Sequence, residues 1–315
     1  MLVSVVIASY NHSAYVAQAI ESVLDQDWSE IDLVVIDDGS KDGSPEIISA
    51  LLARRGGFRF VARENRGALA TFRELLDMAR GDLFCLLASD DYLPPGSLAC
   101  RAGFLAAHSG HVAVFADGFE VDETTGNKKR ILDGRRRRLF DLADPVPEFL
   151  QGLSLPIHTL MARTMVLRRI GGFDPRYRRC EDLDIQLLLF LQGQVGFVDE
   201  AVYCYRVHGA NVSLANPDIA RVDKVLCFNK YLYEVPELVP YRRLIRRMLR
   251  RHYLRLARCV RRSGGSAMER KLLSGAWPLA WQDPRLFGLL ILLGIERPRQ
   301  SSSSGSCRAG EDQDR

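Results

Sequence analysis

The chain has 315 residues, of which 47% are hydrophobic and 26% are charged, and its formal net charge is only +4. This composition excludes an intrinsically disordered chain and fits one globular domain with an appendage, or two small domains. The seven cysteines are odd in number and form no CxxC pair, so we expect a reducing compartment and no disulfide framework.

Short apolar runs alternate with segments of helical spacing through the first 110 residues. The expected strands cover residues 3–7, 33–36, 58–61 and 83–87, and the expected helices cover 13–24, 68–79 and segments that begin at 44 and 94. Four such alternations predict a mostly parallel α/β sheet with helices on both faces. Ligands of such sheets bind beyond the carboxyl ends of the strands.

The second half of the chain changes character. Further strands are expected over 112–115, 195–198 and 202–207, helices over 164–170 and 182–191, and a charged, turn-rich insertion over 122–140. From residue 217 to about 295 the pattern is helical, and the Ser- and Gly-rich end predicts disorder. We therefore divide the chain into a catalytic domain over 1–216 (halves 1–116 and 117–216), a basic helical region over 217–297 and a disordered tail over 298–315.

Carboxylates recur where predicted elements end or begin. Asp37-Asp38 follow the second strand, Asp90-Asp91 follow the fourth, and Glu181-Asp182 begin a later helix. Negative charge gathered at one sheet edge needs a cation, and a cation there can hold a phosphate. This arrangement predicts an enzyme that uses a metal and a nucleotide-linked substrate.

The motifs themselves resemble those of the family 2 glycosyltransferases, which have the GT-A fold. The resemblance is carried by VSVVIASYN at 3–11, VIDDGS at 35–40, ENRG at 64–67 and ARGD at 79–82, and it extends over roughly residues 1–213. These separate motifs occur in order and at family-like spacing. A single Asp-Asp-Gly would be a weak signal.

The resemblance implies a nucleotide-sugar site. Its residues would be Ala8, Ser9, Tyr10, Asp37, Asp38, Asn65, Arg66, Gly67 and Ser89. Tyr10 would stack on the base, Asp38 would accept a base N–H such as that of uracil, and Asp37 would support the loop. The open alternatives are an ordinary strand-to-helix turn at Tyr10 and an Asx-type turn at Asp37-Asp38.

The resemblance also implies a divalent Mg or Mn ion bound by Asp90, with Asp91 helping directly or through water and His208 completing the shell. Such an ion offsets the charge on a leaving nucleoside diphosphate. The alternatives are a helix-start loop at Asp90-Asp91 and a structural His208. The other histidines show no ligand spacing and receive no role.

Two positions depart from the common family pattern. Ala88 stands where an acid is usual, and Phe72 stands where many relatives carry Arg near the diphosphate. Arg66 or Arg73 could substitute for that missing cation, and the sequence does not decide between them.

By the same resemblance, Asp182 is the general base that takes the proton of an acceptor hydroxyl, with Glu181 beside it. A single displacement inverts the anomeric centre and needs one such carboxylate. The alternative is that both acids merely complement a helix N-terminus. Asp184, just past the pair, is expected to be solvated or to cap the helix.

Arginines and apolar residues alternate at helical spacing over residues 241–262. This pattern fits an anionic membrane surface, and the apolar stretch 286–295 could dip into the same interface. A helix packed on the protein with a solvated arginine face is the open alternative, whereas no motif supports nucleic-acid binding. No stretch reaches the roughly 18–20 apolar residues of a membrane span, and no signal peptide is evident. We expect a cytoplasmic protein, with peripheral attachment to the inner face of the plasma membrane left open.

These inferences predict an inverting, metal-dependent glycosyltransferase that moves a sugar from a nucleoside-diphosphate sugar, UDP favoured, to a hydroxyl of a glycan or lipid-linked acceptor in cell-surface polysaccharide synthesis. One rival is a sugar-1-phosphate nucleotidyltransferase, which would carry a Gly-rich basic loop after its first strand. The other is a non-catalytic membrane-surface assembly protein with a degenerate site.

Overall fold

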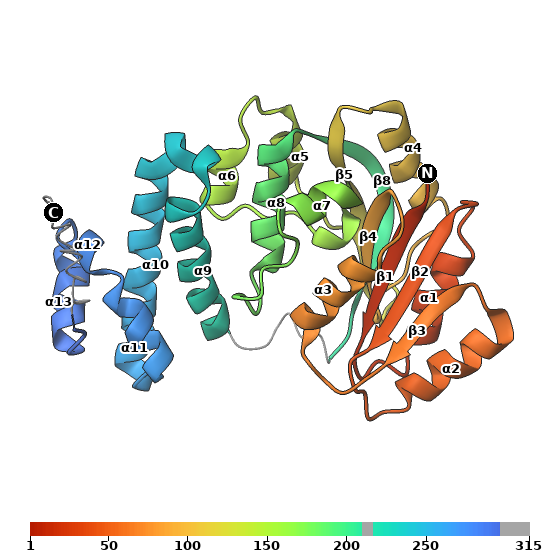
Figure 1. The fold of residues 1–315 in the computed structure, drawn as a ribbon, viewed down its shortest axis with the longest axis horizontal. Coiled ribbons are helices and arrows are strands. Elements are labelled where there is room, and N and C mark those ends of the chain that lie inside the picture. The colour runs from red at the N-terminus through yellow and green to blue at the C-terminus, as the bar shows by residue number, and fades with distance from the viewer. Residues whose placement is uncertain (210–216, 297–315) are drawn as a thin grey trace, which may run out of the picture. The chain divides into compact units, whose positions relative to one another are not determined.

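The computed structural model describes residues 1–209 and 217–296, and within them eight strands form one sheet (Figure 1). The strand order is β3-β2-β1-β4-β7-β5-β6, with β8 paired to β5. The strands are β1 (Val3–Ser9), β2 (Ile31–Asp37), β3 (Phe58–Ala62), β4 (Leu83–Ala88), β5 (His111–Asp122), β6 (Lys128–Arg130), β7 (Met161–Arg163) and β8 (Gln194–Val207).

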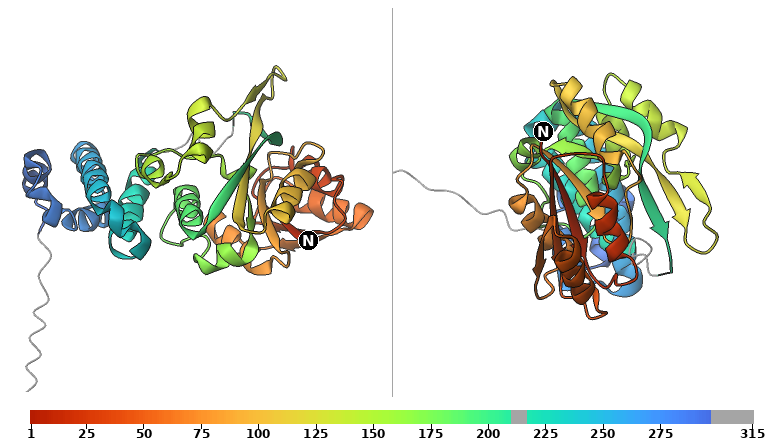
Figure 2. Two further views of the ribbon diagram at one scale, coloured as in Figure 1. Left: turned by 90° about the horizontal axis from the view of Figure 1, so that it is seen from above. Right: turned by 90° about the vertical axis from the view of Figure 1, so that its right-hand side faces the viewer.

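The first four strands are parallel, and each is followed by a helix. These helices are α1 (Val16–Leu24), α2 (Ser44–Arg55), α3 (Ala68–Met78) and α4 (Ser97–Ala107). Alternate residues of β1 such as Val5 and Ile7 pack with α1, α2 and α4, whereas α3 contacts β1 and β2 on the opposite face (Figures 1 and 2). The predicted α/β sheet with helices on both faces is confirmed.

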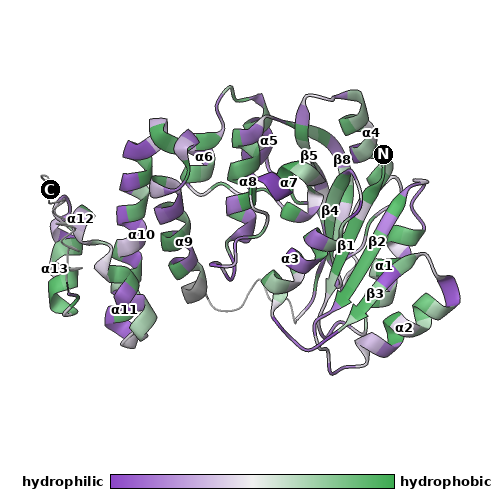
Figure 3. Ribbon diagram, in the orientation of Figure 1, coloured by the Kyte–Doolittle hydropathy of each residue, from purple (hydrophilic) through white to green (hydrophobic). Residues whose placement is uncertain are grey.

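The strands of the inner sheet read as apolar runs because both of their faces are covered. Figure 3 shows this as mainly hydrophobic colour along β1 and the middle of β2. In the register, Ser9 lies opposite Asp37, and Ala8 lies opposite Ala88. The turns after β1, β2 and β4 therefore leave the sheet at the same edge.

The second half of the sheet mixes directions, because β7 is antiparallel to both β4 and β5. Between the strands lie α5 (Gly134–Arg137), η1 (Arg138–Asp141), α6 (Val146–Leu150), η2 (Ile157–Thr159), α7 (Thr164–Arg169) and α8 (Glu181–Gln192). The two strands predicted over 195–198 and 202–207 are one strand, β8, whose register against β5 shifts between Val198 and Ala201. This irregularity explains why the strand pattern in the sequence is interrupted between residues 198 and 202.

The charged insertion after β5 is more ordered than its turn-rich sequence predicts. Buried Asp117 accepts hydrogen bonds from the Leu132 backbone N–H at 3.0 Å and from Arg130 and Arg137 at 2.7 and 2.5 Å. One buried carboxylate therefore gathers the insertion onto β5.

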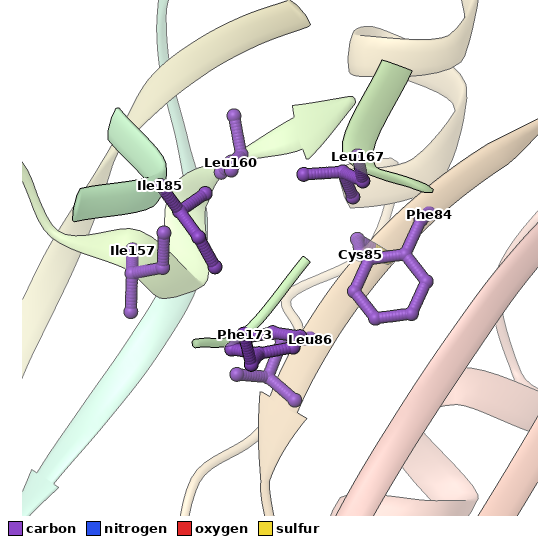
Figure 4. A pocket seen from close by; sticks show the side chains of 8 residues that line it. All are labelled: Phe84, Cys85, Leu86, Ile157, Leu160, Leu167, Phe173 and Ile185. Carbon is purple, nitrogen blue, oxygen red and sulfur yellow. The ribbon is translucent and has the colours of Figure 1, made fainter. Parts of the chain in front are cut away.

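A small apolar cavity of about 10 Å³ lies beside β4 (Figure 4). It is lined by Phe84, Cys85, Leu86, Ile157, Leu160, Leu167, Phe173 and Ile185. That volume is close to the space of a single water, so the cavity is a packing defect and holds no substrate.

The described residues form two compact units, one over Met1–Leu249 and one that begins at Arg250. The C-terminal helices are α9 (Pro217–Tyr233), η4 (Pro236–Tyr241), α10 (Arg242–Ser263), α11 (Ala267–Ser274), α12 (Trp277–Ala280) and α13 (Pro284–Leu292). The predicted helical region is confirmed, but the first unit extends beyond residue 216 and includes α9. The domain boundary proposed there stays a prediction, and the predicted tail over 298–315 lies outside the described residues.

The arginine-rich helix α10 has one covered side. Its apolar residues, such as Ile245, Tyr253 and Leu256, are buried, while arginines such as Arg251 and Arg255 are exposed. The apolar face of α10 is therefore already covered and is not free to enter lipid. Across the described ranges, no helix combines the length and apolarity that crossing a membrane would need.

Candidate active site

The loop after β2 is held by the side chain of Asp37. Its carboxylate accepts hydrogen bonds from the Ser9 hydroxyl at 3.0 Å and from the Ser40 backbone N–H and hydroxyl at 2.8 and 2.6 Å. The residue is fully buried. Asp37 thereby ties the turn after β1 to the turn after β2.

Asp38 connects that edge to the segment before α3. Its carboxylate accepts hydrogen bonds from the backbone N–H groups of Arg66 and Gly67, each at 2.8 Å, and from the guanidinium of Arg63. A Cβ on Gly39 would lie 2.7 Å from the Asn65 nitrogen, so the two loops meet at backbone distance. The predicted residues 65–67 are thus brought beside Asp37 and Asp38.

Arg63 is a site residue that the sequence reasoning missed. Its side chain is 9% exposed and also bonds to Glu74 at 3.0 Å and to the Thr71 hydroxyl at 2.8 Å. An arginine at the end of a strand is common, and only its buried pairing with Asp38 marks it. Its position directly before Glu64-Asn65 was the available signal.

Asp90 lies directly beyond β4, with two imidazoles beside it. The Asp90 Oδ2 atom is 3.2 Å from His208 Nε2 and 3.7 Å from His12 Nε2, and His12 Nδ1 is 2.7 Å from the Ser89 hydroxyl. The predicted residues Ser89, Asp90 and His208 are therefore brought together. His12, to which the sequence assigned no role, joins them because the turn after β1 leaves the sheet at this edge.

Asp91 has different partners from its neighbour Asp90. Its carboxylate accepts hydrogen bonds from the Tyr203 hydroxyl and, at 2.7 Å, from the Arg206 backbone N–H. Burial, together with the charge of Asp90, raises the pKa of Asp91 to about 7. These contacts attach β8 to the Asp90-Asp91 segment, and a role of Asp91 as a metal ligand stays a prediction.

The side chains around Asp90 match a divalent ion only in part. Among residues 1–209 and 217–296, no group of three or more His, Cys, Asp or Glu side chains is arranged to hold a metal. Asp90 and His208 nevertheless offer an oxygen and a nitrogen side by side, which suits Mn²⁺ when substrate oxygens complete the shell. The residues fit a metal shared with the substrate and do not fit a metal held by protein alone.

Glu181 and Asp182 form the first turn of α8. Asp182 accepts a hydrogen bond from the Leu183 backbone N–H at 2.7 Å, and the Ser154 hydroxyl lies 3.5 Å from its second oxygen. Burial raises the pKa of Asp182, and burial raises that of Glu181 to about 7. The Glu181 Oε2 atom is buried, and no described residue is its hydrogen-bond partner. Such carboxylates are suited to proton transfer near neutral pH.

The segment from Ser154 to His158 lies between the two groups of acids. The Leu155 backbone exchanges hydrogen bonds of 2.8 Å with the Gln186 side chain on α8. His158 stacks on Tyr203, with ring centroids 5.1 Å apart, and burial lowers its pKa to about 4. Because Tyr203 bonds to Asp91, this segment joins the start of α8 to the region of Asp90.

Residues 4–169, more than half of the chain, match the family model described as "Glycosyl transferase family 2". The chain belongs to glycosyl transferase family 2. This is a family of transferase enzymes, and the identification from the sequence is confirmed.

Curated relatives of this family 2 chain are distant. It is 28% identical over 231 residues to the glycosyltransferase GlyG of Streptococcus pneumoniae, covering 70% of this chain and 75% of GlyG. It is 25% identical over 231 residues to the chondroitin synthase of Escherichia coli, covering 73% of this chain. The match spans 32% of that synthase, about a third of its length.

Solved structures share the fold at low identity. TarS 1-349 of S. aureus in complex with UDP-GlcNAc superimposes with a TM-score of 0.63 at 19% identity, covering 92% of this chain and 84% of TarS 1-349. The mannosyltransferase PcManGT of Pyrobaculum calidifontis, in complex with GDP-Man and Mn2+, gives 0.56 at 18% identity, covering 93% and 86%. The predicted GT-A fold is confirmed.

The departures of this family 2 member from the usual pattern can now be located. The ring of Phe72 packs on Phe173 with centroids 5.3 Å apart, and Arg73 donates to the Phe173 carbonyl at 2.7 Å. Arg66 is exposed and lies 3.9 Å from Glu74. An apolar contact therefore replaces the expected cation, and of the two candidate substitutes Arg66 is the one whose backbone bonds to Asp38.

One expectation about α8 was wrong. Asp184 is 1% exposed, and its carboxylate lies 2.6 Å from Lys230 Nζ on α9. It is neither solvated nor a cap, because the side of α8 on which it lies is covered by α9. A buried ion pair there could not be inferred while α9 was assigned to a separate region.

Proposed function

We propose that the protein is an inverting, metal-dependent glycosyltransferase that moves a sugar from a UDP-sugar to a hydroxyl of a glycan or lipid-linked acceptor, in cell-surface polysaccharide synthesis. One observation carries this proposal. The loop held by Asp38 and the Asp90–His208 pair leave the same edge of the parallel sheet. Ligands of open α/β sheets bind at that edge.

The donor base has a suitable surface near Asp38. Tyr10 is 48% exposed where β1 ends, which leaves its ring available for stacking. Asp38 carries an acceptor that suits the imide N–H of uracil. TarS is described in complex with UDP-GlcNAc, and this favours UDP as the nucleotide here.

Asp90 and His208 are the residues that would hold the metal. When bound, a divalent ion supplies positive charge against the diphosphate that leaves. Around it, Ser89 and His12 hold one another, and Asp91 fixes Tyr203 and the Arg206 backbone. These contacts keep the Asp90 carboxylate oriented before substrate arrives.

The proton transfer is assigned to α8. Asp182 takes the proton of the acceptor hydroxyl as that oxygen attacks the anomeric carbon, and the sugar inverts in a single displacement. The raised pKa of Glu181, about 7, keeps much of that carboxyl protonated near neutrality, so it adds little repulsion against the Asp182 charge. The pair thus presents one working base.

A groove that could hold part of the acceptor lies beside the Arg66–Gly67 loop. This groove of about 750 Å³ runs along the exposed side of α3 and is closed by Pro175, Tyr177 and Arg178. Arg66 and Arg73 line it, so it has cationic groups for a phosphate-bearing acceptor. Its size lies within the range of small-molecule sites.

Contact with an anionic membrane remains part of the proposal, in a form changed by the burial of the apolar side of α10. The attraction would come from its exposed arginines, each worth about 1 kcal/mol near an anionic surface. On α13, Ile291 and Leu292 are 58% and 62% exposed and could enter the interface. A cytoplasmic location with peripheral attachment follows from this proposal.

The test is turnover of purified protein against UDP-, GDP- and dTDP-sugars with Mn²⁺. Release of UDP from a UDP-sugar, with the sugar's anomeric configuration inverted in the product, is expected. A nucleotidyltransferase would instead form the nucleotide sugar from a sugar 1-phosphate and a nucleoside triphosphate. No turnover in either direction would leave only the assembly protein.

A further inference from the structure

Helix α9 forms hydrogen bonds with the segment that leads into α8. The Asp223 Oδ2 atom accepts hydrogen bonds from the backbone N–H groups of Arg178 and Arg179, at 2.7 and 2.6 Å. About two turns further along α9, Lys230 bonds to Asp174 at 3.1 Å, and Glu234, the residue directly after the helix, bonds to Arg176 at 2.7 Å. Successive contacts therefore fasten residues 174–179 to α9 and its C-terminal end.

Of the contacts with residues 174–179, those of Asp223 lie nearest in the chain to Glu181 and Asp182. It is 1% exposed, and Arg179 is separated from Glu181 by Cys180 alone. Cys180, the residue that precedes α8, makes no side-chain capping bond. The direction in which the chain enters α8 therefore depends on Asp223, which lies more than 40 residues away in the sequence.

We propose that Asp223 is a positioning residue for the acceptor-side acids, holding Glu181 and Asp182 at the angle that proton transfer requires. The inference rests on the proposed function, in which Asp182 is the base. Loss of the two bonds would free residues 178–180 to move, and a displacement of about 1 Å at a reacting group can cost about 10²-fold in rate. Donor binding, which depends on residues around Asp38 and Asp90, would be unaffected.

Asp223 places a third carboxylate beside Glu181 and Asp182. After burial and the charge of Asp182, the charge of Asp223 contributes to the raised pKa of Glu181. The two backbone bonds need only an acceptor oxygen, so a neutral amide at this position would keep the geometry and remove that charge.

The experiment compares Asp223→Ala, Asp223→Asn and a control, Glu237→Ala, which alters an exposed carboxylate on the turn after α9. The probe is the UDP-, GDP- or dTDP-sugar that the wild-type protein hydrolyses fastest with Mn²⁺, read as release of the nucleoside diphosphate. We expect Asp223→Ala to lower kcat about 10- to 100-fold with the donor KM within twofold. Asp223→Asn should recover kcat to within about threefold, since its amide oxygen can accept both bonds, and Glu237→Ala should match the wild type.

Thermal melting first verifies that each variant is folded at the assay temperature. If Asp223→Ala is not, Asp223→Ser takes its place, because its shorter side chain cannot reach both N–H groups. A folded Asp223→Ala or Asp223→Ser protein with kcat within twofold of wild type overturns the inference. So does an Asp223→Asn protein as slow as the alanine variant, or a loss that appears only in KM.

The Asp182→Asn variant distinguishes failure of the proposed function from failure of the positioning role of Asp223. If Asp182→Asn keeps wild-type turnover, or if the wild type hydrolyses none of the donors, the proposed function fails and the inference falls with it. If Asp182→Asn is inactive while Asp223→Ala is fully active, only the positioning role is refuted.

Discussion

Replacing Asp38 by alanine perturbs the point at which two loops of the proposed donor site are joined. The change removes the acceptor of the Arg66 and Gly67 backbone N–H groups and the partner of Arg63. The Arg63 and Asp38 side chains are only 9% and 5% exposed. Breaking a buried charge pair by removing one partner costs about 3–5 kcal/mol. Because Arg63 keeps its bonds to Glu74 and Thr71, we expect the lower end, a loss of about 3 kcal/mol in the free energy of unfolding.

Urea unfolding of the full chain at neutral pH measures this loss. The matched control is Arg66→Ala, which keeps the Arg66 N–H bond to Asp38 and removes a side chain that is 66% exposed and 3.9 Å from Glu74. Such a surface pair is worth about 0–1 kcal/mol. Equal effects of the two variants, or a loss below about 1 kcal/mol for Asp38→Ala, would refute the assignment of Asp38 as the joint between the loops.

The pH dependence of turnover follows from the base. Asp182 must be ionised to act, and burial raises its pKa above 3.8, so kcat should fall with decreasing pH at a midpoint above that value; a midpoint below it would contradict the assignment. In Gly39→Ala, at φ +78°, the new Cβ would lie 2.7 Å from the Asn65 nitrogen, whereas Gly43 has a similar φ and open space around it. Gly39→Ala should therefore be about 1–3 kcal/mol less stable in urea unfolding than Gly43→Ala. Equal stabilities would show that the two loops do not meet closely. In flotation assays, phosphatidylglycerol vesicles should retain the wild type and release a quadruple Arg→Gln variant of α10. A control variant with two Arg→Gln changes on α2 should float like the wild type. Equal retention of all three proteins would exclude the arginine face of α10 as the membrane-binding surface. The changed positions are Arg251, Arg255, Arg258 and Arg262 on α10, and Arg54 and Arg55 on α2.

The sequence predicted the sheet and its functional edge because both are encoded locally. Apolar runs such as residues 33–36 can be recognised without knowledge of their partners, and parallel strands bring their carboxyl ends to one edge. The motif residues Ser9, Asp37 and Asp90 stand at or just beyond the ends of these strands, so their place at that edge could be predicted as well. The assignment of individual roles to these side chains stays a prediction.

What the sequence could not supply depends on contacts across long separations. His12 meets Asp90 across 78 positions, and Asp184 meets Lys230 through a helix that the pattern assigned to another region. No local periodicity distinguishes a buried ion pair from a solvated acid. For the same reason the grip of Asp223 on the entry to α8 emerges only from the packed structure.

The most direct test of the account is the metal dependence of donor binding and turnover at Asp90. Isothermal titration of UDP with and without Mn²⁺, for the wild type and Asp90→Asn, is combined with release of UDP from UDP-GlcNAc. The account predicts that Mn²⁺ tightens UDP binding to the wild type, and that Asp90→Asn loses both this enhancement and turnover. An Asp90→Asn protein with wild-type turnover, or UDP binding to the wild type that is indifferent to Mn²⁺, would contradict it.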